Sequence, residues 1–409
     1  ASLAMWCGNN EIYEGMRYWG WSKKYENPEI WKEMQRGYDK IFHQLLPEMV
    51  SRYDAGRFCM HSSPYEANWG RPESWKIADS HNWGIWYGQK PFESLDTEIP
   101  RFMSEYGFQA FPEMKTIATF ATPEDYALES DVMNAHQKAT IGNALIKKTM
   151  ALYYNEPKDF EELVYKGLVL QGMGIRRGIE AHRRNRPFCM GTLYWQLNDN
   201  WPVASWSSLE YGGKWKPLHY MAKRFFAPVA VVAQPEINNG EANIKKGDIY
   251  ALNDTAETLK GELLVEYWTY DGKILSVKKS AVTLSPDSST RVGSFALPAD
   301  FNEPVFLHLT LTTSKGVSRN DWHFGFYKDM PLADAKIDMK VEGNEATLST
   351  DKPAFFVWAN VRGVKGEFSD NCVTLLPGRA LKVKWNVSNG TKALSEHKMT
   401  VTHLKSCTK

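Results

Sequence analysis

The stretch SLAMWCGNNE, residues 2–11, is an apolar run that stops at Gly8, two asparagines and a glutamate. Its apolar part, LAMWC, predicts a short buried strand. From Pro28 to about Tyr53 apolar side chains recur at helical spacing, with a proline suited to the first turn and Pro47 expected to kink the helix. A strand and then a long helix form a β/α unit, which places Glu11 at the carboxyl end of a strand.

The same alternation continues to about residue 229. Further strands are expected in RFCMH (57–61), around HNWGIWYG (81–88), in RFMSEYG (101–107) and in FCMGTLYW (188–195). Helical patterns run over 123–154, 159–184 and 216–226. This texture predicts parallel strands joined by crossover helices. Five such units are too few for an eight-stranded barrel, so we expect the missing units to precede Ala1.

The remainder of the chain predicts a different architecture. Beyond residue 229 short strands alternate apolar and polar residues between turns, which is typical of β-sandwiches. A break near KDMPLADAK (328–336) divides them. The predicted domains are therefore 1–229, 230–328 and 331–409, and the two sandwiches show no sequence repeat. Of 16 tryptophans, only Trp268, Trp322, Trp358 and Trp385 follow residue 215, so the two regions differ in kind.

Composition narrows the classes of function. With 409 residues, two or three domains are expected, because single cores stop growing at roughly 250–300 residues. The net charge of +1 gives no broad field for nucleic acid or an anionic membrane, and a neutral partner fits better. No apolar stretch approaches the ~18 residues of a membrane span. The five scattered cysteines indicate structural thiols, and the compartment stays open.

Two glutamates follow predicted strands directly. Glu11 ends GNNE and Glu105 lies in MSEYG, where catalytic groups of parallel α/β folds gather. Hydrolysis of a glycoside with retention needs two carboxyls about 5 Å apart, one as acid and one as nucleophile. A lone glutamate after a strand is more often a surface or capping residue, but the pair favours a glycosidase.

Three motifs resemble those of family 2 glycoside hydrolases and, within them, β-mannosidases. WCGNNE is similar to the acid/base motif at the end of barrel strand four, and FMSEYGFQ is similar to the nucleophile motif at strand seven. GTLYWQLNDNWPVASWSSLEYGGKWKPLHYMAKRFFAPV (191–229) resembles the strand-eight segment and closing helix. FSDNCVTLLPGRALKV (368–383) is similar, more weakly, to the family's C-terminal immunoglobulin-like domain.

The resemblance implies a fold and a set of roles. The fold would be a multidomain α/β and all-β protein: strands four to eight of a (β/α)8 barrel, then two immunoglobulin-like β-sandwiches. Glu11 would be the acid/base and Glu105 the nucleophile of a retaining exo-β-mannosidase acting on oligosaccharides or glycosides. The implied sugar-binding residues are Asn10 at the 2-hydroxyl, Tyr87 against the nucleophile, and Trp19 and Trp195 as pocket walls. The missing N-terminal portion of the same protein is an implied partner, and residues 1–409 alone are expected to be weakly active or inactive.

Alternatives stay open at this point. Another family 2 specificity (β-galactosidase, β-glucuronidase or exo-β-glucosaminidase) or a non-catalytic sugar-binding fragment would fit the same residues. His81, Trp83, Gln196 and Asp199 could contact sugar hydroxyls or simply pack. No cofactor or metal is expected, because the histidines lack ligand spacing. The glycine-rich GMGIRRG (172–178) has no strand before it, which indicates helix packing rather than a phosphate loop.

Overall fold

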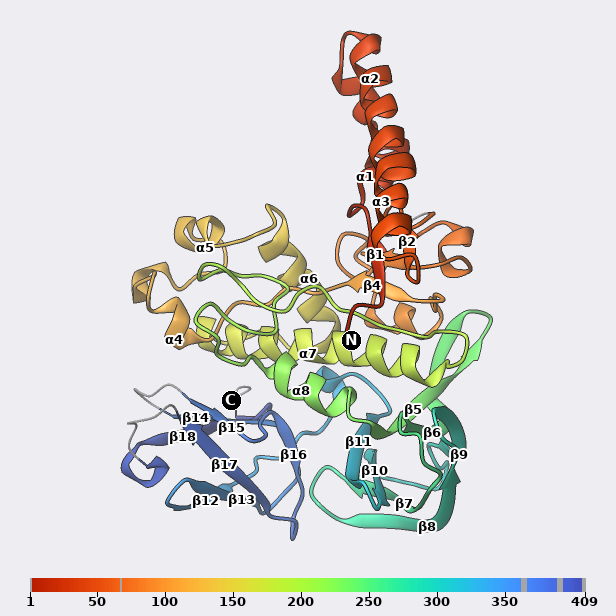
Figure 1. The fold of residues 1–409 in the computed structure, drawn as a ribbon. Coiled ribbons are helices and arrows are strands. Elements are labelled where there is room, and N and C mark those ends of the chain that lie inside the picture. Colours follow the sequence, from red (N-terminus) through yellow and green to blue (C-terminus); the bar gives the residue numbers. More distant parts are fainter. Residues whose placement is uncertain (1, 67, 362–365, 388–392, 407–409) are drawn as a thin grey trace.

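The computed structural model describes residues 2–66, 68–361, 366–387 and 393–406. It consists of a mixed α/β part followed by β-sandwich, immunoglobulin-like domains, as the sequence predicts in outline. Figure 1 shows the α/β part above the two sandwiches, with α7 (Phe160–Arg184) running between the layers. Within the described residues, no helix is long and apolar enough to cross a membrane.

The α/β part contains four short strands and eight α-helices among the described residues. The strands are β1 (Met5–Cys7), β2 (Phe58–Met60), β3 (Ser80–Asn82) and β4 (Met103–Tyr106). The helices are α1 (Ile12–Tyr18), α2 (Pro28–Tyr38), α3 (Leu46–Tyr53), α4 (Met114–Ile117), α5 (Asp131–Ala135), α6 (Gly142–Tyr153), α7 and α8 (Pro217–Phe225). Short 3₁₀ turns lie at Trp21–Lys24, Pro72–Trp75, Phe92–Asp96 and Pro123–Asp125.

All strand pairs of this part are parallel. β1 pairs with β2, and β3 pairs with β4. Isolated parallel bridges join Asn10 to Ser63 and Met103 to Thr192. The two pairs are separate two-stranded sheets, and within each of them the parallel pairing is the one that the β/α alternation predicts.

Three predicted elements differ in detail. The helix expected over 28–53, with a kink at Pro47, consists of α2, a π-helical stretch, Asp39–Leu45, and α3; the widened turn before the proline accommodates a residue without an N–H. The predicted helix over 123–154 is interrupted, since His136 and Lys138 exchange backbone hydrogen bonds with Ala204 instead. Residues 188–195 form no regular strand; only a bridge and three backbone bonds tie 191–195 to β4.

The central helix α7 explains the glycine-rich segment. A Cβ at Gly172 would lie 2.4 Å from Met221 Sδ of α8, and one at Gly178 would lie 2.6 Å from the Tyr106 ring. These glycines let neighbouring elements approach the helix closely. The helix-packing interpretation of GMGIRRG is thus confirmed.

The two sandwiches are antiparallel. The first joins a sheet β5-β6-β9 to a sheet β11-β10-β7-β8, made of β5 (Val229–Asn238), β6 (Glu241–Asn253), β7 (Leu259–Thr269), β8 (Ile274–Leu284), β9 (Ser288–Ala296), β10 (Val305–Thr313) and β11 (Gly316–His323). The second joins β12-β13-β17-β15 to β16-β14-β18, made of β12 (Ile337–Glu342), β13 (Glu345–Thr350), β14 (Ala354–Val361), β15 (Gly366–Phe368), β16 (Val373–Leu375), β17 (Leu381–Val387) and β18 (Met399–Thr402). Short 3₁₀ turns lie at Tyr327–Asp329 and Leu394–Glu396.

Both sandwiches pack against α7. The Tyr165 hydroxyl donates to the Phe356 carbonyl of the second sandwich, and Arg176 donates to the Asp321 carbonyl of the first. One continuous apolar core runs from β4 and α7 into Phe306 and Phe355 of the two sandwiches. This shared core holds the α/β part against the two sandwiches.

Candidate active site

The turn after β1 depends on Gly8 and on two hydrogen bonds of the Asn9 side chain. A Cβ at Gly8 would meet the His61 carbonyl at 2.5 Å, so only glycine fits there. The Asn9 amide donates to that carbonyl at 2.8 Å, and its oxygen accepts from the Ile12 N–H at 3.1 Å. Glu11 then caps α1 with a left-handed backbone, φ 59°, and its own N–H donates to the Ser63 carbonyl. The turn thereby directs Glu11 across the ends of the strands.

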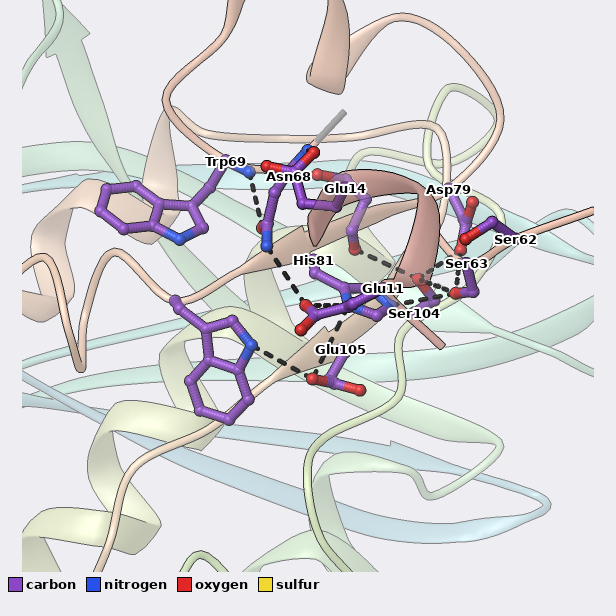
Figure 2. Close-up of polar contacts among 12 residues, drawn as sticks. Glu11, Glu14, Ser62, Ser63, Asn68, Trp69, Asp79, His81, Ser104 and Glu105 are labelled. Carbon is purple, nitrogen blue, oxygen red and sulfur yellow. Dashed lines mark hydrogen bonds and ion pairs between the residues drawn. The ribbon is translucent and has the colours of Figure 1, made fainter. Parts of the chain in front are cut away.

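Glu105 reaches the same place from β4. Its register partner on β3 is His81, and the Trp83 indole N–H donates to Glu105 Oε1 at 3.1 Å. His81 Nδ1 lies 3.7 Å from that oxygen and 2.7 Å from Glu11 Oε1 (Figure 2). One ring nitrogen of His81 and one carboxylate oxygen each of Glu11 and Glu105 all lie within 4.8 Å of one another. The structure therefore brings the two predicted carboxyl groups together, at a separation close to the ~5 Å of retaining glycosidases.

A second contact holds Glu11 from the other side. Asn68 Nδ2 donates to Glu11 Oε1 at 3.2 Å. The Asn68 backbone N–H in turn donates to the buried carboxylate of Glu14, which forms an ion pair with Arg71 at 2.6 Å. Because Glu14 belongs to α1, this ion pair joins the helix that follows Glu11 to the loop that carries Asn68.

The electrostatics of Glu105 combine opposing causes. The residue is 8% exposed, and burial raises its pKa. A protonated His81 acts against this rise, the negative charge of Glu11 adds to it, and the hydrogen bond from Trp83 acts against it. The hydrogen bond from Trp83 thus favours the ionised form that a nucleophile needs, and a positive charge on His81 would act in the same direction.

A cation is not the best account of the cluster. Among the described residues, one group has its oxygen and nitrogen ligand atoms close enough to share an ion: Glu11, His81 and Glu105. However, 2.7 Å between Nδ1 and Oε1 is a hydrogen-bond distance, whereas two ligands at ~2.0–2.1 Å from one tetrahedral metal lie roughly 3.3 Å apart. We therefore assign a shared proton to this contact.

The four predicted sugar-binding residues lie at different distances from the pair. Asn10 is exposed beside Glu11 and bridges to Ser63. The Trp195 backbone N–H donates to the Tyr106 carbonyl, next to Glu105, and its side chain is 42% exposed. Trp19 follows α1 at 47% exposure and packs edge-on against Trp21; within the described part of the chain, no contact joins it to the carboxyl pair.

Tyr87 occupies a different position from the one expected. The donor to Glu105 is Trp83, and among the hydrogen bonds of the described residues none joins Tyr87 to Glu105. The Tyr87 ring lies 5.7 Å from the Trp83 ring and is 48% exposed. Burial raises the pKa of its phenol, and the charge of Glu11 adds to the rise, so Tyr87 lies within electrostatic reach of the pair.

The sequence did not indicate Asn68, Ser63 or Asp79 as site residues. Asn68 binds Glu11, and Ser63 contacts both Asp79 and His81. Only the spacing of Asp79 and His81, two residues apart where the chain enters β3 at Ser80, could have indicated that both point to the same side. Asp199 proves to be a loop-bonding residue, since it binds Lys138, Ser205 and Ser207.

Comparisons with known proteins match most of the chain. It is 28% identical to β-mannosidase B of Aspergillus niger, over 94% of this chain and 48% of the relative. It is also 28% identical to β-mannosidase of Mus musculus, over 90% and 45%. The chain thus spans about half the length of the curated relatives it matches.

Solved structures agree. The crystal structure of β-D-mannosidase from Dictyoglomus thermophilum superposes with a TM-score of 0.83 at 29% identity, covering 98% of this chain and 48% of that one. The exo-chitosanase CsxA of Amycolatopsis orientalis shares the fold, with a TM-score of 0.66 at 15% identity over 87% of this chain and 48% of that one.

Family models match both sandwiches. Residues 245–329 match a mannosidase Ig/CBM-like domain, and residues 329–407 match the mannosidase Ig-fold domain. Sequence similarity, fold and domain content together support a β-mannosidase-like protein of glycoside hydrolase family 2.

Proposed function

We propose that this chain is the catalytic C-terminal portion of a retaining exo-β-mannosidase that hydrolyses terminal β-D-mannosyl residues. The observation that carries the proposal is the placement of Glu11 and Glu105 within 4.8 Å of the same histidine and of each other. That separation leaves no room for a water molecule between the carboxyl group and the sugar, as an inverting mechanism needs.

The chemistry then runs in two steps. Glu11 gives its proton to the glycosidic oxygen while a Glu105 oxygen bonds to the anomeric carbon, and the electron pair of the broken C–O bond leaves with the aglycone. Water then attacks the anomeric carbon, Glu11 takes a proton from that water, and the bond to Glu105 breaks. Trp83 and the sugar-binding set Asn10, Trp19, Tyr87 and Trp195 would orient the nucleophile and the sugar.

The fold assignment belongs to the same proposal. We assign β1, β2, β3, β4 and the extended segment at 191–195 to strands four to eight of a (β/α)8 barrel. The parallel pairs β1–β2 and β3–β4 and the bridge from Met103 to Thr192 support this order. The domains would be 1–229, 230–328 and 331–409.

An upstream portion of the same protein is the proposed partner. Large apolar side chains are exposed at both ends of the proposed strand series: Leu3, Met5 and Trp6 on one side, Met190 and Leu193 on the other. Such surfaces and the free edge of β1 suit further strands. Residues 1–409 alone should therefore be weakly active or inactive, and addition of the upstream portion should restore hydrolysis.

Substrate choice is tested with p-nitrophenyl glycosides. The protein that includes the upstream portion should cleave the β-mannoside in preference to the β-galactoside, β-glucuronide and β-glucosaminide. Preference for one of the others would assign the site to that specificity. Binding of mannose without hydrolysis of any of them would favour the non-catalytic sugar-binding alternative.

The residue roles are tested by azide rescue. Glu11→Ala with azide should give β-mannosyl azide, because azide attacks the covalent intermediate, and Glu105→Ala should give the α-azide by direct attack. Glu98→Gln is the matched control, since Glu98 is a neighbouring carboxylate paired with Lys90. Azide products of the reverse configurations would exchange the two roles.

A further inference from the structure

A chain of hydrogen bonds runs from Glu11 into the protein. Glu11 Oε1 meets His81 Nδ1 at 2.7 Å, and His81 Nε2 meets the Ser63 hydroxyl at 2.9 Å. Ser63 donates to Asp79 Oδ2 at 2.5 Å (Figure 2). His81 is 1% exposed and Asp79 is 6% exposed, so these bonds are shielded from competing water.

The protons of this chain can be counted. A hydroxyl has a single proton, and Ser63 gives it to the Asp79 carboxylate, which is an acceptor only. The Ser63 oxygen must therefore accept at its contact with His81, so His81 Nε2 carries a proton; the Ser104 hydroxyl, 3.5 Å from Ser63, gives its own proton to Asp79. Asp79 is held in place for this by the Tyr65 N–H at 2.8 Å and by the Ser104 hydroxyl at 2.7 Å.

The consequence falls on the other ring nitrogen. A neutral imidazole has only one N–H, and that proton is already committed at Nε2. A hydrogen bond between Nδ1 and Glu11 Oε1 then needs a further proton, which belongs to Glu11 when the ring is neutral. If Nδ1 instead held the neutral ring's only proton, Glu11 would face it as a carboxylate with nothing to donate.

We propose that Asp79 and Ser63 are positioning residues: they fix the Nε2–H form of His81 and so keep a transferable proton in the Glu11–His81 contact. The position of the proton follows from the geometry alone, while its use as the catalytic proton rests on the proposed function.

The charges around the ring are consistent with this count. Glu11 faces His81 from the turn before α1, Glu105 from β4 at 3.7 Å, and Asp79 from behind Ser63. Asn68 is the neutral donor on Glu11. With a proton in the Glu11–His81 contact, Glu105 has one carboxylate charge fewer beside it, which favours its ionisation.

The test that needs no activity reads the ring nitrogens directly. The 409-residue chain is labelled with ¹⁵N in its 10 histidines, and His81→Gln identifies the His81 signals. Near neutral pH, we expect Nε2 of His81 to be protonated. Ser63→Ala removes the acceptor and should move the ring proton to Nδ1, whereas Ser104→Ala, which removes the other hydroxyl bound to Asp79, should leave it at Nε2. An unprotonated Nε2 in the unaltered chain would overturn the proposal.

The second test reads the acid step in protein that contains the upstream portion. General acid catalysis contributes ~10²–10⁴-fold. Ser63→Ala and Asp79→Asn should therefore slow a phenyl β-mannoside at least tenfold more than the 2,4-dinitrophenyl β-mannoside, whose leaving group needs no proton. Ser104→Ala should leave that ratio unchanged. Equal slowing of both substrates would reduce Ser63 to a structural role. If the unaltered protein cleaves no β-mannoside, the proposed function fails, and the nitrogen signals still decide the position of the proton.

Discussion

Replacing Gly178 by alanine tests how closely α7 holds the strand that carries Glu105. The new Cβ would lie 2.6 Å from Tyr106 Cε2 and 3.0 Å from its Cζ and hydroxyl oxygen. Ordinary contact between such atoms is ~3.5–4.0 Å, so the helix or β4 has to move by about 1 Å. Tyr106 is fully buried, follows Glu105 directly and packs at the core, so its ring has no free direction of escape.

Two terms decide the sign of the stability change. Alanine gains about 1 kcal/mol over glycine inside a helix, but overpacking a dense core costs ~1–3 kcal/mol. We expect Gly178→Ala to lower the free energy of unfolding by up to about 2 kcal/mol. Because a ~1 Å displacement of a reacting group costs ~10²-fold in rate, activity should fall by more than stability alone explains.

Gly167→Ala is the matched control on the same helix. Its Cβ would meet Met150 Cε at 3.6 Å, an ordinary contact, so this variant should be more stable by up to about 1 kcal/mol. Calorimetry and urea unfolding compare the two variants with the unaltered protein. If Gly178→Ala were as stable as Gly167→Ala, the close approach of Tyr106 would not limit the packing, and the reasoning would be refuted.

Three further predictions concern buried charges. Burial raises the pKa of Glu105, so the stability that this carboxyl group contributes is complete below its ordinary pKa and is lost as the pH rises through the raised value. Glu105→Gln should therefore be more stable than the unaltered protein at pH 7. Its gain in melting temperature should shrink toward pH 4. Burial lowers the pKa of Lys216 to about 8 from 10.5, which lowers the free energy of unfolding by about 3 kcal/mol at pH 7. Lys216→Met should therefore raise the free energy of unfolding by up to that amount at pH 7, and by less as the pH rises from 8 to 10.5. Arg379→Ala leaves the 2%-exposed Glu266 without its two-bond partner and should cost ~3–5 kcal/mol in urea unfolding, whereas Arg291→Ala, at an exposed pair, should leave the urea midpoint nearly unchanged; equal losses would contradict the argument.

The sequence predicts the architecture well where periodicity is strong. The helix α7, the parallel β/α order and the change to sandwiches near residue 229 all follow from repeating apolar positions. It fails where tertiary contacts replace local bonds. Residues 136–138 leave the helical pattern because they bond to Ala204, a segment more than sixty residues away that no local pattern identifies.

For the site, the sequence predicts the carboxyl groups but little of their surroundings. Glu11 and Glu105 are visible because each stands at the end of a predicted strand, and this position is local information; in the structure Glu11 lies in the turn after β1 and Glu105 lies within β4, one residue before its end. Asn68, Ser63 and Asp79 contribute through side-chain contacts that depend on how loops fold over the strand ends. Hydrophobic patterning carries no information on such contacts; the resemblance implied Tyr87 as the partner of Glu105, whereas the hydrogen bond to Glu105 in the structure comes from Trp83.

One irregularity of the sheet connects Glu105 to the hydrogen bonds that run from Glu11 through His81 and Ser63 to Asp79. Ser80 pairs with Met103, but His81 pairs with Glu105, so the register skips Ser104. In an unbroken register His81 would face Ser104, and Glu105 would face Asn82. The skipped serine donates its hydroxyl proton to Asp79 Oδ2 at 2.7 Å, and its oxygen lies 3.2 Å from the Ser80 carbonyl, where the ladder is interrupted. Because bulges re-aim side chains beside active sites, the same local defect that brings His81 to Glu105 also braces the carboxylate behind Ser63. The spacing of the two carboxyl groups and the protonation of the ring between them therefore depend on one feature of the backbone.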